Sequence, residues 1–399
     1  QSPVIYGPFQ GPVGQAMESR TGYAPQYSDH MHSSEHCRSC HDLNTPTIDM
    51  HTNQPTGDEF PEQAPYTEWA NSDYADGQSR EAHCQDCHMQ SPGPDYLSRI
   101  AVMPNGDVNV NWPERGPYYQ HEMVGANAWM LDLLGEFRAE LGIDQVSTEQ
   151  GFSDKAAFTR DFLDGAASVS VQGAGLNGNT VEFDVTVTNH AGHKLPTSFP
   201  SRRVWLATRI RDAEGQVVFE SGHPDPETNR LAVDAQYTTH DCLEEHKADS
   251  FDSAQCYMPH VDTVTAADEI PIYEPVLEAT DGHITHILLY ADGFLKDNRI
   301  PPAGFDAATA PAHVQPHGVD GDADFNANQS GTDQVAYRVP LEQAPATPLT
   351  AEVTLYYQTV RPTFIDGLHG DHAFIDHFHA MAASNPSTVE VLDQVSVSF

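Results

Sequence analysis

The chain has 399 residues, of which 39 % are hydrophobic, and its 58 acidic and 19 basic side chains give a formal net charge of −39. The hydrophobic fraction is large enough for a packed core, and the length suits two or more domains. The charge argues against nucleic acid as a partner, because binding to phosphates requires basic side chains. The same reasoning argues against an anionic membrane face.

Two copies of the sequence Cys-x-x-Cys-His occur in the first quarter of the chain. One runs from Cys37 through Cys40 to His41, and the other from Cys84 through Cys87 to His88. Two thiols at this spacing can add to the two vinyl groups of one porphyrin, and the histidine that follows then lies under the iron as proximal ligand. A Cys₄ zinc site is the main alternative, but its two halves usually lie about 15–20 residues apart. The motifs therefore predict two covalently bound haems c.

Residues 1–124 are predicted to form a dihaem domain that is organised by its cofactors. Apolar periodicity is weak there, Pro and Gly are frequent, and histidines are dense. Such a segment would struggle to build a core alone, and two haems would supply apolar surface around which it could condense.

Each iron needs a sixth ligand or an open position. The chain has 22 His residues, so two bis-histidine haems are favoured, whereas methionine ligation would give a higher potential. A histidine just before a haem motif cannot easily reach the far face of its own haem but can reach a neighbouring one. Candidate distal histidines are His30, His32, His36, His121 and His193, and the methionine alternatives are Met31, Met103 and Met123.

Residues 125–166 are predicted to be a helical connector. Trp129, Leu133, Phe137 and Leu141 recur every four residues, which indicates an amphipathic helix over about 125–142. A second helix is expected at about 153–165, with Ser153 as its N-cap.

Residues 167–399 are predicted to form an antiparallel β-sandwich, so that the fold class is mixed, mainly irregular plus β. Apolar residues alternate from Val181 to Val187, and further short strands are expected at 204–210, 217–219, 283–290, 335–339, 349–360 and 389–399. An acidic loop near 222–268 contains Cys242 and Cys256, the two cysteines outside the haem motifs. In an oxidising compartment they are predicted to form a disulfide. Alternating carboxylates at Asp320, Asp322 and Asp324 could bind Ca²⁺, although the offsets of an EF-hand are absent.

The sequence resembles a family of exported multihaem c-type cytochromes with a C-terminal β-sandwich-like half. The matching stretches are residues 33–41, 62–69 (EQAPYTEW), 84–89, 121–127 (HEMVGAN), 192–197 (GHKLPT), 200–206, 219–222, 272–274 and 296–299 (KDNR). The resemblance implies haem c and electron transfer without a settled substrate. It favours His30, His121 and His193 as distal ligands, and more loosely His260, over His36. A histidine-rich stretch at 368–379 departs from the family.

These observations predict an exported electron carrier rather than a catalyst. No run of 18 apolar residues is present, and the chain begins at Gln1 in a polar stretch, so we expect a mature periplasmic, cell-surface or extracellular protein whose leader has been removed. Expected partners are redox proteins or other copies of the chain, including a homopolymeric filament. The alternative is a haem enzyme with one open iron site that acts on a small molecule.

Overall fold

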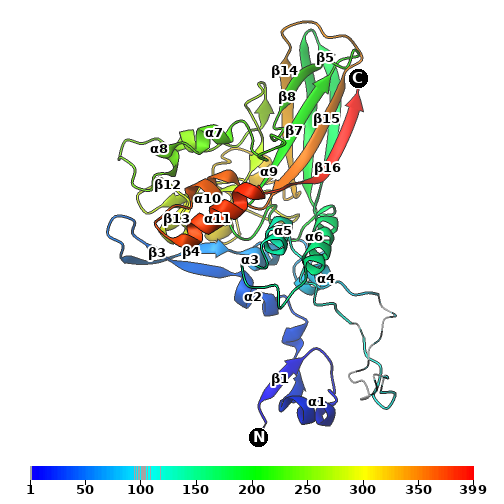
Figure 1. Ribbon diagram of the computed structural model, residues 1–399. Coiled ribbons are helices and arrows are strands. Elements are labelled where there is room, and N and C mark those ends of the chain that lie inside the picture. Colours follow the sequence, from blue (N-terminus) through cyan, green and yellow to red (C-terminus); the bar gives the residue numbers. More distant parts are fainter. Residues whose placement is uncertain are drawn as a thin grey trace. The chain divides into compact units, whose positions relative to one another are not determined.

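The computed structural model describes residues 2–93, 95, 97, 99, 105, 107, 109–116 and 118–399 (Figure 1). Its contacts divide the chain into two compact units. The first unit comprises Gln1–His41 and Tyr74–Gly125, and the second comprises Asp42–Asp73 and Ala126–Phe399. The predicted boundary at 124 lies next to the observed one. The segment between the two Cys-x-x-Cys-His sequences, however, belongs to the second unit rather than to an uninterrupted N-terminal domain.

Packing of an aromatic residue explains why this inserted segment belongs to the second unit. Phe60 is only 1 % exposed and packs in a hydrophobic cluster with Leu277 and Ala291. The hydroxyl of Thr47 donates a hydrogen bond of 2.9 Å to the carbonyl oxygen of Ala291. The segment therefore shares its core with residues more than two hundred positions away, a contact that no local pattern encodes.

The first unit contains short elements and little apolar core. Its elements are β1 (Val4–Gly7), α1 (Gly14–Thr21), β2 (Ala24–Tyr27), the 3₁₀ helix η1 (Asp29–Met31), α2 (Glu35–His41) and α4 (Cys84–His88). Strands β1 and β2 pair in parallel. Among the described residues of this unit, the buried hydrophobic side chains are Ala75 and Val124.

The second unit contains several sheets and the other helices. Its elements before residue 250 are β3 (Leu43–Ile48), β4 (Pro55–Gln63), α3 (Pro65–Ala70), α5 (Ala128–Glu136), α6 (Glu149–Leu163), β5 (Ala167–Asn177), β6 (Thr180–Asn189), β7 (Arg203–Arg211), β8 (Val217–Ser221), α7 (Asp234–Tyr237) and α8 (His240–Leu243). The later ones are η2 (Ser253–Cys256), β9 (Thr263–Val264), β10 (Ile272–Tyr273), β11 (Pro275–Ala279), β12 (Ile284–Thr285), η3 (Leu288–Tyr290), β13 (Ala291–Asp297), η4 (Ala312–Val314), α9 (Ala323–Asn326), β14 (Thr332–Pro340), β15 (Thr350–Gln358), α10 (Pro362–Gly367), α11 (Ala373–Ser384) and β16 (Val389–Ser398).

Two sheets of this unit contribute to one large hydrophobic core (Figure 1). One sheet has the strand order β5-β6-β14-β9, and the other has the order β10-β7-β15-β16 with β8 also paired to β7. The pairs are antiparallel except that between β9 and β14. Strand β6 alternates buried and half-buried residues, as its sequence predicts, and Phe183 stacks on Tyr337 of β14 with ring centroids 4.7 Å apart. The interior strand β7 is buried almost throughout.

Several sequence expectations differ from the structure in detail. The first predicted helix ends at Glu136, and the chain continues in turns. The second begins at Glu149, where the hydroxyl of Thr148 accepts a hydrogen bond of 3.0 Å from the Gly151 amide, so Thr148 rather than Ser153 is its cap. The strand expected at 283–290 is instead the short strand β12 followed by η3. The predicted disulfide joins Cys242 and Cys256.

Four charged residues from three of the quoted sequence motifs meet in a buried ionic network. The ammonium group of Lys194 lies 2.6 Å from Asp297, and the guanidinium of Arg299 lies 2.7 Å from the same carboxylate. Arg299 also lies 3.3 Å from Glu68, which accepts a 3.0 Å hydrogen bond from the Lys194 amide. Burial lowers the pKa of Lys194, whereas Arg299 and Lys194 together hold the pKa of Asp297 well below its usual range despite burial. These motif positions therefore join the inserted segment to the rest of the second unit.

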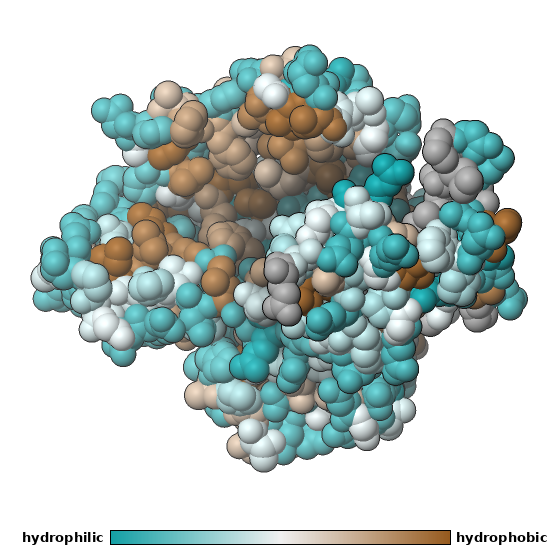
Figure 2. Space-filling model, turned by 90° about the horizontal axis from the view of Figure 1, so that it is seen from below, coloured by the Kyte–Doolittle hydropathy of each residue, from teal (hydrophilic) through white to brown (hydrophobic). Residues whose placement is uncertain are grey.

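The surface agrees with the composition. On the face drawn in Figure 2 hydrophilic residues predominate, and hydrophobic ones lie in separate groups between them. In the part of the chain that the structure describes, no helix combines the length and apolar character needed to cross a membrane.

Candidate cofactor-attachment site

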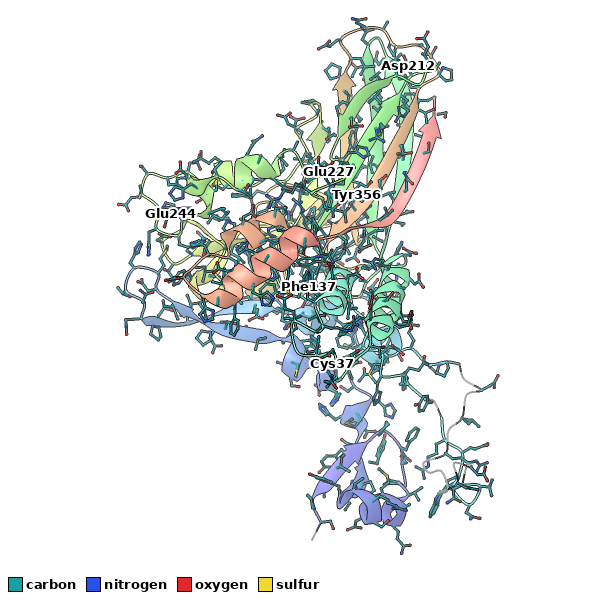
Figure 3. The ribbon with its side chains drawn as sticks, in the orientation of Figure 1. Cys37, Phe137, Asp212, Glu227, Glu244 and Tyr356 are labelled. Carbon is teal, nitrogen blue, oxygen red and sulfur yellow. A yellow bond between two sulfur atoms is a disulfide. The ribbon has the colours of Figure 1, made fainter. Side chains whose placement is uncertain are left out.

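The first Cys-x-x-Cys-His motif lies on helix α2, and Figure 3 labels its first cysteine, Cys37. The hydroxyl of Ser33 accepts a hydrogen bond of 3.0 Å from the Glu35 amide at the start of the helix. Positions i, i+3 and i+4 of a helix lie on one face, so Cys37, Cys40 and His41 share a face of α2. Cys37 is half-buried, whereas Cys40 and His41 are exposed.

The second motif lies on the short helix α4. The backbone amide of His83 donates a hydrogen bond of 2.9 Å to Asp86, as in a capping box, and the His83 ring lies 3.0 Å from Asp76. Cys84, Cys87 and His88 again occupy positions i, i+3 and i+4 of one helical face.

The two motif helices touch each other. The thiol of Cys37 lies close enough to the sulfur of Cys84 for the two groups to shift each other's pKa, with Cys37 acting as the hydrogen-bond donor. The Cys84 amide donates a bond of 3.1 Å to the hydroxyl of Ser34, and the side-chain amide of Gln85 donates one of 3.0 Å to the carbonyl of Ser33. The hydrogen bond from Cys37 lowers the pKa of Cys84, an effect that the hydroxyl of Ser34 reinforces. The first cysteines of both motifs therefore lie side by side.

His88 has the environment of a metal-binding imidazole. Its Nδ1 lies 2.5 Å from the carbonyl oxygen of Val124, to which it can only donate. A neutral ring held in this way carries its lone pair on Nε2, and such a bond to a carbonyl is the usual second contact of a metal-ligating histidine. Burial lowers the pKa of His88, although the hydrogen bond to Val124 acts in the opposite direction, so the neutral form of the ring is favoured.

The other predicted ligands in the first unit fall into two groups. The His30 and His36 rings meet edge to face with centroids 5.3 Å apart, and both residues are exposed, as is His121. By contrast, the ring of His32 is held by the carbonyl oxygen of Pro8 at 2.7 Å. Of the methionines considered, Met31 and Met123 lie in this unit, and Met103 lies outside the described residues.

His193 and His260 belong to the second unit, and each has partners within it. The Nδ1 of His193 lies 3.0 Å from the carbonyl oxygen of Lys194. His260 lies beside the carboxylates of Asp262 and Asp322, at 2.7 and 2.9 Å. In the histidine-rich stretch, His372 caps helix α11 and His379 lies 2.6 Å from the carbonyl oxygen of Leu368.

The described residues do not support the zinc alternative. Clusters of three or more histidine, cysteine or carboxylate ligand atoms within 4.8 Å occur at two places, and neither includes a cysteine of the motifs. The three carboxylates of the acidic run have different surroundings. Asp322 caps α9 and joins His260, whereas Asp324 accepts hydrogen bonds from the Asn328 side chain and the Gln334 amide, and Asp320 is exposed.

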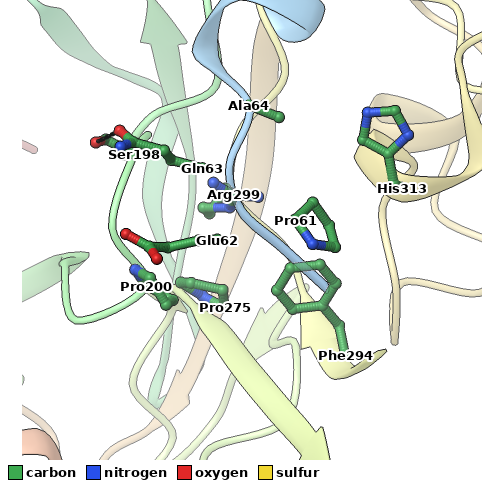
Figure 4. Close-up of a pocket in the computed structure, with 10 residues that line it drawn as sticks. All are labelled: Pro61, Glu62, Gln63, Ala64, Ser198, Pro200, Pro275, Phe294, Arg299 and His313. Atoms are coloured by element: carbon green, nitrogen blue, oxygen red, sulfur yellow. Dashed lines mark hydrogen bonds between the residues drawn. The ribbon is translucent and has the colours of Figure 1, made fainter. Parts of the chain in front are cut away.

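The second unit also has a small pocket, shown in Figure 4. Its lining residues are Pro61, Glu62, Gln63, Ala64, Ser198, Pro200, Pro275, Phe294, Arg299 and His313. The hydroxyl of Ser198 donates a bond of 2.7 Å to Gln63, and Arg299 is already paired with Glu68 and Asp297. Apolar residues alternate with polar ones around the wall, and Ser198, Gln63 and Arg299 already have partners within the second unit.

Comparisons with known proteins give little further guidance. No protein-family model matches the chain, and no curated protein matches it. Among solved structures, the penta-heme cytochrome c552 from Thermochromatium tepidum is similar at a TM-score of 0.47 and 12 % sequence identity, over 99 % of this chain and 68 % of that one. A likeness at this level carries no argument about the cofactors of this chain, so the functional conclusion rests on its own residues.

Three residues important for the site were missed by the sequence analysis. Ser34 and Gln85 join the motif helices, and the carbonyl of Val124 orients His88. Ser34 is 1 % exposed and Val124 also 1 %. A polar residue and an apolar residue at isolated positions give no periodic signal, although both lie within stretches quoted for the family resemblance.

Proposed function

We propose that this chain is an exported c-type cytochrome that carries electrons through two covalently attached haems. The observation that carries the proposal is the placement of two Cys-x-x-Cys-His sequences on adjacent helices, with Cys37 in contact with Cys84. Haem c bound there would supply one-electron redox chemistry. The protein would supply attachment, ligation and the spacing between the two centres.

The residues of the site fit two such groups. Each helix presents two thiols and one imidazole on a single face, which is the donor set that thioether attachment and proximal ligation require. The four thiols belong to Cys37, Cys40, Cys84 and Cys87, and the imidazoles to His41 and His88. The neutral ring of His88, held through Nδ1, supports the assignment most directly.

The sparse core of the first unit supports a cofactor-organised domain joined to a β-sandwich. Ala75 and Val124 are its buried hydrophobic side chains among the described residues, whereas Ile5, Tyr6, Tyr23 and other large apolar side chains are exposed. A unit of this size needs apolar surface to offset the loss of conformational entropy on folding. Porphyrin rings would provide that surface.

The proposed distal ligands are histidines, so that both haems are low-spin and bis-histidine. His30 and His121 are exposed in the same unit as both motifs, and His193 is the third candidate. His36 and His260 rank lower. Both nitrogens of His260 already have partners in the second unit.

Spectroscopy of the purified holoprotein tests electron transfer and separates it from catalysis. We expect a low-spin ferric spectrum, reversible one-electron reduction of each haem, and no spectral change when CO is added to the reduced protein. A high-spin component that binds CO would instead support the alternative of a haem enzyme with one open iron site.

We further propose that copies of the chain assemble into a filament. In a filament, a histidine of one subunit would ligate the haem iron of the next and so bring haems of successive copies together. If the carrier is monomeric, its partners would be other redox proteins. Electron microscopy of native preparations should show polymers if this proposal is correct. Sedimentation as monomers alone would exclude it.

A further inference from the structure

Three carboxylates meet where strands β9 and β14 and helix α9 of the second unit come together. Asp262 directly precedes β9, Asp322 is the N-cap of α9, and Asp333 is the second residue of β14. One ligand atom from each of them, and one from His260, all lie within 4.8 Å of one another. The carboxylates of Asp262 and Asp322 also contact each other.

Asp333 is the residue that distinguishes this cluster from an ordinary acidic turn. It is 1 % exposed, and its Oδ2 accepts a hydrogen bond of 2.5 Å from the hydroxyl of Tyr273. Its Oδ1 is buried and has no hydrogen-bond partner. A buried carboxylate oxygen without a partner is costly, because burial removes the water that would solvate it.

Other buried acids of this unit have a cationic partner or two hydrogen-bond donors. Asp234 is paired with Arg203, Asp297 with Lys194 and Arg299, Glu68 with Arg299, and Glu274 with Lys296. Glu245 accepts hydrogen bonds from the Thr285 hydroxyl and the His286 amide. Among the described residues, no lysine or arginine forms an ion pair with Asp262, Asp322 or Asp333, so no permanent cation balances these three carboxylates.

Asn298 fixes the orientation of His260 toward these carboxylates. The Oδ1 of Asn298 accepts from the Glu274 amide, and its Nδ2 donates to the carbonyl of Ile272. The same Nδ2 lies 3.1 Å from Nδ1 of His260, which must therefore accept. Nε2 therefore carries a proton and donates to Asp322 and Asp262, so that the ring orients two carboxylates.

We propose that Asp262, Asp322 and Asp333 bind one divalent cation of the Ca²⁺ type, with His260 as the residue that positions two of the carboxylates. Hard cations of this class take oxygen ligands, and Ca²⁺ completes its shell of about 6–8 oxygens with carbonyls and water. Of these three proposed ligands, only Asp322 belongs to the calcium site predicted from the sequence, which consisted of Asp320, Asp322 and Asp324. The cation would tie the chain before β9, the start of α9 and the start of β14 to one another.

Calcium binding by the holoprotein tests the proposal. Equilibrium dialysis with Ca²⁺, followed by elemental analysis, should find one calcium per wild-type chain. Asp333→Asn keeps the size of the side chain and should weaken binding by more than about tenfold, because ligand charge sets the affinity. Asp262→Asn should also weaken binding, and it should disturb folding less than Asp333→Asn because the Asp262 side chain is 60 % exposed.

Asp320→Asn is the matched control, since Asp320 is exposed in the same loop but outside the cluster. It should bind calcium as the wild type does. The proposal is overturned if the wild-type chain binds no calcium, or if Asp333→Asn and Asp262→Asn both bind it as the wild type does. It is equally overturned if Asp320→Asn abolishes binding while Asp333→Asn retains it, because the cation would then sit on the alternating run.

Discussion

The thiols of Cys37 and Cys84 lie close enough to shift each other's pKa, so the first cysteine of one Cys-x-x-Cys-His sequence is a neighbour of the first cysteine of the other. The hydrogen bond of Cys84 to Ser34 and that of Gln85 to Ser33 keep the two helices in this position. Two porphyrins attached at these sulfurs would be neighbours.

Neighbouring haems should be electronically coupled. We expect the Soret band of the holoprotein to give a two-signed circular dichroism couplet that is stronger than the signal of either haem alone. Replacing Cys84 and Cys87 by Ser should remove one haem and leave only the weaker signal of the other. Replacement of Cys37 and Cys40 should have the same effect. A couplet that persists at full strength in either variant would refute the coupling.

Loss of a distal histidine should open one iron. In His30→Ala and His121→Ala we expect part of the ferric spectrum to become high-spin and about half of the reduced haem to bind CO. His32→Ala and His83→Ala are the controls, because the Pro8 carbonyl and Asp76 hold those rings. If all four variants stay low-spin, the distal ligands lie elsewhere, with His193 the next to test.

The buried ionic network of the second unit should be important for stability. Asp297→Asn removes the partner of both Lys194 and Arg299 and should lower the free energy of unfolding by about 3–5 kcal/mol, the usual cost of leaving a buried charge unpaired. Denaturant unfolding followed by circular dichroism measures this. The exposed pair of Arg138 and Glu149 is the control, and Glu149→Gln should change stability by no more than about 1 kcal/mol. Similar effects of the two variants would contradict the prediction.

Acid should destabilise the second unit through His286. Burial, with Arg361 and Lys247 nearby, lowers the pKa of this residue to about 3. Between about pH 6.5 and pH 3 the unfolded chain binds a proton that the folded chain rejects, so stability falls as the pH falls, by about 1.4 kcal/mol per unit. In His286→Asn the unfolding free energy should therefore depend less steeply on pH over this range. Replacing the exposed His246 by Asn should leave the slope unchanged, and equal slopes in all three proteins would exclude the effect.

The two haem motifs could be found from the sequence because each is complete within five residues. The contact between Cys37 and Cys84 could not, since the intervening chain packs into the other unit through Phe60. Alternation predicted strand β6 because one of its faces is buried and the other partly exposed. At 283–290, alternation predicted one strand, whereas the structure has the short strand β12 and the 3₁₀ helix η3.

Buried charges were the other feature that sequence reasoning could not place. Charged residues are usually exposed, so nothing in the sequence indicates that Glu68, Lys194 and Asp297 meet in the interior. Likewise Asp322 was grouped with its sequence neighbours, whereas the structure brings it to Asp262 and to Asp333. Such groupings depend on how distant strands pair, which periodicity does not specify.

The most direct test of the account is the number of covalent haems per chain. Pyridine haemochrome analysis, together with the intact mass of the denatured protein, should give two haems for the wild type. It should give one haem for each variant in which both cysteines of one motif are replaced by Ser. Replacing Cys242 and Cys256, which form the disulfide, should leave two haems. A wild-type chain with no covalent haem, or with stoichiometric zinc in its place, would contradict the central claim.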